Sequence, residues 1–272
     1  CRCDVSVPRS CRLRAGAART ASKLADMTIE GRVVCCPDKF RGTLTAREAA
    51  SALASGARRA GRDAVELPLA DGGEGTLDVL CPFSTQRRTT RVTGPLGDPV
   101  EAEWGVRDDS AVVEMARASG LALVQERDPL AATTRGTGEL IAAALDAGFR
   151  RVIVAVGGSA TTDGGLGALE ALDFDLRAAE VLVACDVTTP FVDAARVFGP
   201  QKGATPDQLD VLEARLRRLA ERYLDETGRD VRALAGAGAA GGLAGGLAAL
   251  GARLVPGAPL VAGLVELPDA LR

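Results

Sequence analysis

Short continuous runs of apolar residues alternate along the chain with longer stretches whose apolar residues recur at helical spacing. Such runs occur at residues 33–36, 151–156 and 181–185. A continuous apolar run is typical of a strand buried on both faces of a parallel sheet, because neither face of that strand meets water. The pattern therefore predicts an α/β fold in which helices separate the strands.

The first apolar run begins a strand–helix–strand unit. Thr45 and Glu48 have the spacing of a capping box, and the Ala-rich stretch after them predicts a helix that ends near Gly61. Residues 64–68 predict the second strand of the unit. Loops at the carboxyl ends of such strands are where open α/β sheets bind ligands, so we expect the site there.

Later parts of the chain predict further elements of both kinds. Residues 100–106 and 111–115 flank a polar turn and predict an antiparallel hairpin. Thr205 and Gln208 form a second capping box, which predicts a long helix reaching about residue 226. The Gly- and Ala-rich residues 236–251 predict a tight loop and a closely packed helix.

The composition favours a globular protein that acts on a small molecule. The chain has 272 residues, of which 47% are hydrophobic, and this is enough for a substantial core. Its net charge of −3 provides no positive field that would attract nucleic acid. No apolar run approaches the roughly 20 residues that span a bilayer, so we expect no membrane partner.

The absence of histidine restricts the chemistry. A chain with no His cannot form a Ser-His-Asp or Cys-His catalytic arrangement. Proton transfer must then fall to Asp, Glu, Lys, Tyr or Cys. The seven cysteines are odd in number and include no Cys-x-x-Cys pair, so we expect a reducing, cytoplasmic location.

The first 26 residues differ from the rest of the chain. Residues 1–26 are rich in Arg, Ser and Ala, and they show no periodic apolar pattern before Met27. We expect a disordered leader or upstream sequence read through before a start at Met27. An organellar transit peptide is the alternative, although no clear amphipathic helix supports it.

Two loops carry basic residues that could meet an anion. The loop after the first strand places Asp38, Lys39 and Arg41 within four positions, as a site for an anionic ligand would require. Lys202 stands just ahead of the helix capped by Thr205, where the positive end of the helix dipole already lies, and this favours a bound anion. Ordinary surface loops are the alternative for both.

The loop at residues 71–76 combines glycines with carboxylates. Gly72 and Gly73 allow backbone N–H groups to approach a ligand closely. Asp71 and Glu74, three residues apart, could hold Mg²⁺ or accept a hydroxyl proton. A simple turn needs fewer glycines, so the loop is a candidate site.

A second glycine-rich loop, residues 157–165, lies between a predicted buried strand and a predicted helix that begins near residue 166. Hydroxyls, free amides and a helix N-terminus together can hold a phosphate, and a carboxylate adds a metal or proton partner. The loop lacks the Gly-Lys-Ser/Thr ending of a Walker A sequence. Its candidate residues are Gly157, Gly158, Ser159, Thr161, Thr162 and Asp163.

These four loops, in their order along the chain, resemble those of the bacterial-type glycerate kinase family, and the likeness extends over most of residues 31–268. Residues 137–139, 185–186 and 201–203 match it as well. The resemblance implies two α/β domains, one inserted in the other, with the active site between them. It also implies ATP and Mg²⁺ as cofactors and glycerate as substrate, giving phosphoglycerate, with the 2-phosphate favoured, in a monomer or homodimer.

The resemblance suggests roles for the candidate residues and limits for the domains. Asp71 or Asp163 would be the base or a metal ligand, Lys39 would assist catalysis, and Glu74 and Asp186 would complete the metal site. The remaining candidates would bind substrate or phosphate. Residues 31–80 would form the N-terminal part of the first domain, and residues 81–272 would form the inserted second domain.

Two departures from the family pattern bear on activity. The family has a longer connection where this chain has only residues 173–180, which indicates an internal deletion. The chain stops at Arg272, before a later Gly-Glu-Gly-Arg block of the family, so we expect an incomplete first domain. The alternatives to an active kinase are therefore an inactive fragment or another protein that binds a sugar acid or nucleotide.

Overall fold

The structure is a computed structural model that describes residues 31–40 and 42–272. The predictions for residues 1–26 and for Arg41 lie outside the described residues. Two sheets are present in the described part of the chain, one with two strands and one with six. Helices separate the parallel strands, so the predicted α/β class is confirmed.

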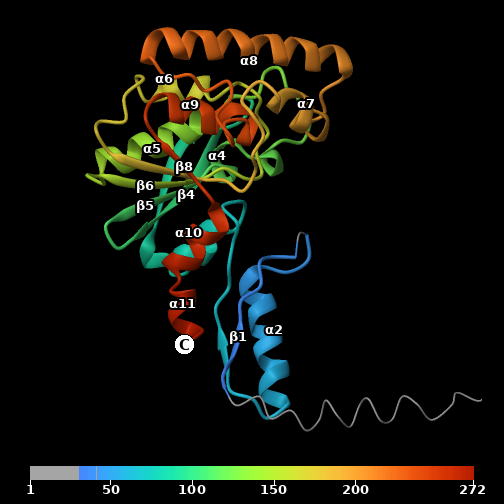
Figure 1. The fold of residues 1–272 in the computed structure, drawn as a ribbon, viewed down its shortest axis with the longest axis vertical. Coiled ribbons are helices and arrows are strands. Elements are labelled where there is room, and N and C mark those ends of the chain that lie inside the picture. The colour runs from blue at the N-terminus through green and yellow to red at the C-terminus, as the bar shows by residue number, and fades with distance from the viewer. Residues whose placement is uncertain (1–30, 41) are drawn as a thin grey trace, which may run out of the picture.

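The N-terminal lobe consists of β1 (Val33–Cys35), α2 (Ala46–Arg59) and β2 (Ala64–Glu66). The two strands are parallel, as the sequence predicts, and Val34 pairs with Val65. The capping box of α2 is also confirmed, because the Thr45 side chain accepts a hydrogen bond from the Glu48 amide. Figure 1 shows this lobe, in blue, projecting from the larger body of the protein.

The larger body is built on a sheet with the strand order β3-β4-β5-β6-β7-β8. Strands β3 to β5 are antiparallel, which confirms the predicted hairpin, and strands β5 to β8 are parallel. The first and last strands were not predicted, because neither is a continuous apolar run. The strands are β3 (Arg87–Thr93), β4 (Pro99–Arg107), β5 (Ser110–Glu114), β6 (Arg151–Ala155), β7 (Glu180–Ala184) and β8 (Arg253–Val255).

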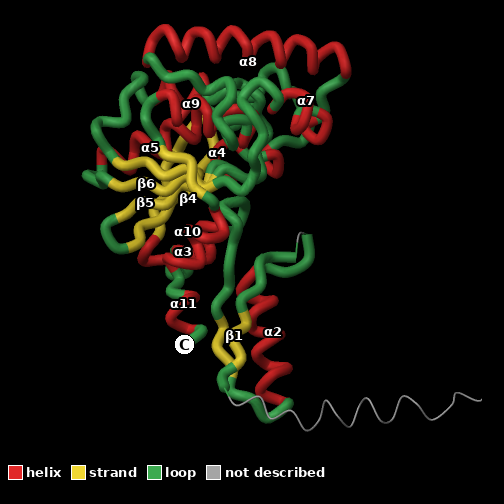
Figure 2. The backbone as a smooth tube through the Cα atoms, viewed as in Figure 1, coloured by secondary structure: helices red, strands yellow, loops and turns green. Residues whose placement is uncertain are grey.

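Helices cover both faces of this sheet, as Figure 2 shows. Alternate residues of a strand point to opposite faces, so Val113 and Val154 join one core while Val112 and Ile153 join the other. The first core packs against α5 (Arg135–Asp146), α6 (Leu166–Ala171), α8 (Pro206–Thr227) and α9 (Leu243–Ala249), and the second packs against α3 (Thr76–Leu80) and α10 (Gly257–Leu264).

The remaining helices in the described part of the chain are short. None of its helices combines the length and apolar character that crossing a bilayer requires. The division into domains at residue 80 stays a prediction, although α3 packs against β4 and β5 of the large sheet. The short helices are α4 (Ala116–Ser119), α7 (Ala194–Phe198), α11 (Leu267–Ala270) and the 3₁₀ turns η1 (Ser84–Gln86), η2 (Leu121–Leu123), η3 (Pro200–Lys202) and η4 (Ala239–Gly242).

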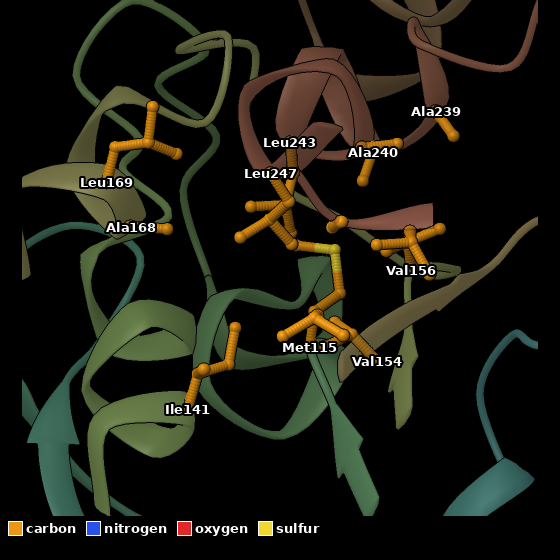
Figure 3. Packing of buried hydrophobic residues seen from close by; sticks show 14 of the residues in the cluster. Met115, Ile141, Val154, Val156, Ala168, Leu169, Ala239, Ala240, Leu243 and Leu247 are labelled. Atoms are coloured by element: carbon orange, nitrogen blue, oxygen red, sulfur yellow. The ribbon is translucent and has the colours of Figure 1, made fainter. Parts of the chain in front are cut away.

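The larger core is closely packed around the end of β5. Figure 3 shows the Met115 side chain extending toward Leu243 and Leu247 of α9, and all three residues are fully buried. At Gly246 of the same helix, an added Cβ would lie 2.7 Å from the Gly164 carbonyl oxygen. Helix α9 can approach the backbone at Gly164 this closely because glycine has no side chain. This is the close packing that the Gly- and Ala-rich sequence predicts.

We expect truncation of Leu216 on α8 to destabilise the fold, because this side chain is fully buried in the larger core. Leu216→Ala should lower the free energy of unfolding by about 2–5 kcal/mol, measured by urea titration. Val211→Ala is the control, since Val211 lies on the same helix and is 48% exposed. Equal losses in the two variants would contradict the assignment of the buried face of α8.

Candidate active site

The parallel strands β5 to β8 bring their carboxyl ends to one edge of the sheet, and the loop at residues 71–75 crosses this edge. The Gly157 amide donates a hydrogen bond to the Gly72 carbonyl at 3.3 Å. A Cβ added at Gly72 would lie 2.7 Å from the Ala184 carbonyl oxygen, and one added at Gly257 would lie 2.0 Å from that of Asp71. A side chain at position 72 or 257 would therefore collide with the neighbouring backbone, and glycine avoids this.

Glu114 holds the crossing loop in place, and the sequence reading missed it. Its Oε2 atom accepts hydrogen bonds from the amides of Gly75 at 3.0 Å and Leu77 at 2.9 Å. The side chain is buried, and this burial raises the pKa of its carboxyl group. The one available signal was a carboxylate at the end of an otherwise apolar strand, just before Met115.

The crossing loop and the loop after β6 enclose a cavity of about 480 Å³, which we call the glycine-loop cavity. Both glycine-rich loops contribute backbone to it, and two carboxylates and one guanidinium line it as well. The structure therefore brings together most of the predicted residues of these two loops. The lining includes Asp71, Gly72, Gly73, Arg127, Gly157, Gly158, Ser159 and Asp186.

Both carboxylates of the glycine-loop cavity are exposed and positioned by the backbone. Asp71 accepts a hydrogen bond from the Gly73 amide at 2.9 Å. The two oxygens of Asp186 accept from the amides of Gly257 at 2.8 Å and Ala258 at 3.0 Å, at the start of α10. Each oxygen keeps a further lone pair, so both carboxylates can still bind a ligand or a metal ion.

A second cavity, of about 980 Å³, lies between the N-terminal lobe and the larger body. We call it the inter-lobe cavity, and it is lined by Asp38, Lys39 and Glu74 among the predicted residues. Glu74 lines this cavity, whereas Asp71 and Asp186, with which the predicted metal site grouped it, line the glycine-loop cavity. The Glu74 side chain instead packs against Gly158, where an added Cβ would lie 2.3 Å from its Oε1 atom.

The wall of the inter-lobe cavity carries an ion-pair network that the sequence reading also missed. Arg87 contacts Asp78 at 2.6 Å and Glu103 at 3.0 Å, and Arg117 contacts Asp78 at 2.9 Å. Arg117 also lies 3.5 Å from Glu114, so the network joins the anchor of the crossing loop. These charges come from separate elements, and nothing in their sequence spacing brings them together.

Asp163 belongs to the scaffold of the site and lines neither cavity. The residue is 8% exposed, and its carboxylate accepts hydrogen bonds from the amide and the hydroxyl of Thr134, both at 2.8 Å. It also accepts from the amides of Gly165 and Gly167 at 3.1 and 3.3 Å. Asp163 therefore fixes the starts of α5 and α6, and it is nearly buried within this scaffold.

Lys202 is also buried, at 1% exposure, although the sequence suggested an anion contact. Its Nζ donates to the Thr161 carbonyl, and burial lowers the pKa of the amine to about 7, with Asp163 acting in the opposite direction. Thr161 and Thr162 are fully buried as well, and the Thr162 hydroxyl has no hydrogen-bond partner in the described structure. The structure does not bring these three residues to either cavity.

The chemistry of the glycine-loop cavity fits Mg²⁺ bound together with phosphate. Among the described residues there is no cluster of three or more His, Cys, Asp or Glu side chains that could hold a metal alone. Mg²⁺ is usually bound by one or two carboxylates together with substrate phosphates and water. Asp71 and Asp186 supply the two carboxylates, and the glycine-rich backbone beside them has no side chains that would keep phosphate oxygens away.

An α/β fold with glycine-rich loops and two carboxylates facing one cavity at the carboxyl edge of a parallel sheet suits an enzyme that transfers phosphoryl groups. The sequence model of the Glycerate kinase family matches residues 33–180 and 173–272. The chain belongs to this family, which confirms the resemblance inferred from the loops.

Individual relatives give the same assignment. The glycerate kinase of Bacillus subtilis is 44% identical, over 79% of this chain and 67% of that protein. The glycerate 2-kinase of Escherichia coli is 40% identical, over 88% of this chain and 73% of that protein. The crystal structure of a putative glycerate kinase 2 from Salmonella typhimurium superposes with a TM-score of 0.79 at 40% identity, covering 88% of this chain and 75% of that one.

The match to the family model is divided into two segments where the sequence indicated a deletion. Its two segments overlap at residues 173–180, the connection between α6 and β7. Four residues of this connection, none of them glycine, have positive φ: Asp173, Phe174, Arg177 and Ala178, at 51 to 57°. Residues other than glycine rarely adopt this backbone conformation, so the short connection is strained.

We expect Lys202 to make stability depend on pH, because the pKa of its buried amine is lowered from 10.5 to about 7. Below pH 7 both folded and unfolded states are protonated, and the buried charge destabilises the fold. Between about pH 7 and 10.5 the folded state loses the proton first, so this destabilisation is relieved as the pH rises. Lys202→Met should therefore raise stability most at pH 6 and least at pH 10, as measured by urea unfolding.

The control for this experiment is Leu216→Ala, which removes no titrating group. Its effect on the free energy of unfolding should stay nearly constant from pH 6 to pH 10. A stability difference between Lys202→Met and the unmodified protein that did not change over the same range would contradict the burial of a titrating amine.

Proposed function

We propose that this chain transfers a phosphoryl group from ATP to a hydroxyl of D-glycerate, with Mg²⁺, and that the product is phosphoglycerate, with the 2-phosphate favoured. The observation that carries the proposal is the glycine-loop cavity, where the backbone of two glycine-rich loops and the carboxylates of Asp71 and Asp186 face one space. Relatives that are named glycerate kinase, at 40 to 44% identity, support the choice of substrate.

Phosphoryl transfer requires positioning and charge neutralisation more than covalent chemistry from the protein. The amides of Gly73 and Gly157 already donate within the protein, to Asp71 and to the Gly72 carbonyl. The rest of the backbone of the two glycine-rich loops can approach phosphate oxygens closely, because no side chains intervene. Mg²⁺, when bound, would neutralise charge on the phosphates, and Asp71 and Asp186 would hold it. Asp71 is also our candidate for the carboxylate that accepts the hydroxyl proton, since Asp163 is engaged by the scaffold.

Lys39 would neutralise an anionic group near the crossing loop. It lines the inter-lobe cavity, and its side chain reaches Gly75, where an added Cβ would lie 3.8 Å from the Lys39 Cδ atom. Asp38 lies 3.8 Å from the Lys39 amine and orients it. The carboxylate of glycerate is a suitable partner for this amine, so we assign substrate binding to these two residues.

A reducing location such as the cytoplasm also fits the proposal. Cys35, Cys36, Cys81 and Cys185 are all free thiols in the described structure. Burial raises the pKa of the Cys81 thiol to about 11, so it stays protonated and unreactive at neutral pH. These thiols would then serve as small apolar groups.

We expect Asp71→Asn and Asp186→Asn to lower the turnover number by about 100-fold or more. Each replaces a carboxylate, proposed to bind the metal ion or accept the proton, with a neutral amide. ADP release from ATP with Mg²⁺ and D-glycerate, followed by a coupled assay, would measure this loss. Asp225→Asn removes an exposed carboxylate from α8 and should leave the rate unchanged.

Three outcomes would count against these proposals in different ways. Full turnover by Asp71→Asn would remove Asp71 from the mechanism. A folded sample of the unmodified chain that binds ATP and releases no ADP would indicate a non-catalytic member of the family. Activity with another sugar acid, and none with D-glycerate, would overturn the proposed substrate.

A further inference from the structure

The glycine-loop cavity has one basic side chain in its lining among the described residues, and that side chain is Arg127. Two carboxylates, Asp71 and Asp186, face the same space. A phosphate chain entering this cavity would meet two negative charges, so it needs a cation there in addition to any metal ion. Lys202 cannot serve, because it is buried with its amine on the Thr161 carbonyl.

The backbone at residues 201–203 positions Arg127. Its Nη1 atom donates to the Gln201 carbonyl at 3.0 Å, and Gln201 lines the same cavity. The stem of the side chain lies against Gly203, where an added Cβ would be 3.1 Å from the Arg127 Cβ and 3.2 Å from its Cδ. Gly203 has a φ of +91°, which a side chain would disfavour, so the turn leaves room for the arginine.

The guanidinium of Arg127 keeps most of its donors available. It has five N–H bonds, and the hydrogen bond to Gln201 is the one interaction that the described structure gives it. Arginine stays protonated at any physiological pH, and its planar group can bind two phosphate oxygens at once. Arg127 is exposed, so a ligand in the cavity can reach it.

We propose that Arg127 binds the phosphate chain of ATP in the glycine-loop cavity, and that Gly203 provides the space in which Arg127 lies. This inference rests on the proposed function and adds to it the residue that neutralises the nucleotide. A phosphate chain is favoured over the glycerate carboxylate because it carries more negative charge, and because the glycine amides and the two carboxylates suit phosphate and Mg²⁺.

The test is the dissociation constant of Mg·ATP, measured by calorimetry without glycerate. We expect Arg127→Ala to weaken binding about tenfold or more, as the loss of a hydrogen bond to a charged group does. Arg127→Lys should fall between, because it keeps the charge and loses the planar fork. Arg218→Ala, which removes an exposed arginine from α8, should bind Mg·ATP like the unmodified protein.

Two further readouts separate binding from folding and from the carboxylate alternative. The unfolding temperature of Arg127→Ala without ligand should match that of the unmodified chain, because an exposed side chain with one hydrogen bond contributes little to stability. The Michaelis constant for D-glycerate should change less than about twofold. A large rise in that constant with unchanged Mg·ATP binding would assign Arg127 to the carboxylate and overturn the proposal.

Gly203 provides a test that leaves the charge in place. Gly203→Ala should weaken Mg·ATP binding in the unmodified chain and weaken it less once Arg127 is replaced by Ala, because the contact with the Arg127 Cδ is then gone and only the one with the Cβ remains. Equal effects in both backgrounds would overturn the role of Gly203.

The outcome for Arg127 is independent of turnover. If Mg·ATP binding depends on Arg127 but glycerate is not phosphorylated, the proposed function fails and this inference stands. Binding by Arg127→Ala within about twofold of the unmodified protein overturns it, as does a chain that does not bind Mg·ATP.

Discussion

The site depends on the close approach of backbones where the loop at residues 71–75 crosses the ends of the parallel strands. A Cβ added at Gly157 would lie 2.4 Å from the Gly73 Cα, which real structures do not tolerate. Glycine at these positions lets two loops from distant parts of the chain pack against each other and line one cavity. The buried carboxylate of Glu114 fixes this arrangement, because it accepts hydrogen bonds from the amides of Gly75 in the crossing loop and Leu77 in α3.

The same constraint divides the loop after β6 into two parts with different roles. Gly157, Gly158 and Ser159 line the glycine-loop cavity, whereas residues 160–165 are buried beneath it. In the buried part, Asp163 accepts hydrogen bonds at the starts of two helices, and Lys202 donates to the Thr161 carbonyl. A binding site keeps a fixed geometry only when neighbouring groups hold its backbone in place. The buried Asp163 and Lys202 hold the part of the loop that follows Gly157, Gly158 and Ser159.

Much of this arrangement could be predicted from the sequence, because it follows from local patterns. Continuous apolar runs predicted the central parallel strands, and capping boxes predicted α2 and α8. Strands β3 and β8 lack such runs, so no pattern indicated them. Burial is what the sequence could not show within the site. A polar side chain in a glycine-rich loop looks the same in sequence whether it lines a cavity, like Asp71, or is buried at a helix start, like Asp163.

Charge explains why the missed residues matter. The sequence drew attention to Lys202 because it precedes a helix, yet a lysine that reaches the interior loses its hydration and much of its value as a counter-charge. Arg127 carries no comparable signal, since its loop has no glycine-rich pattern, and only the fold brings it against residues 201–203. A turn that buries the lysine therefore also presents an arginine to the cavity. Which basic residue can contact a ligand depends on which side chain lines the cavity. Sequence spacing alone does not show this.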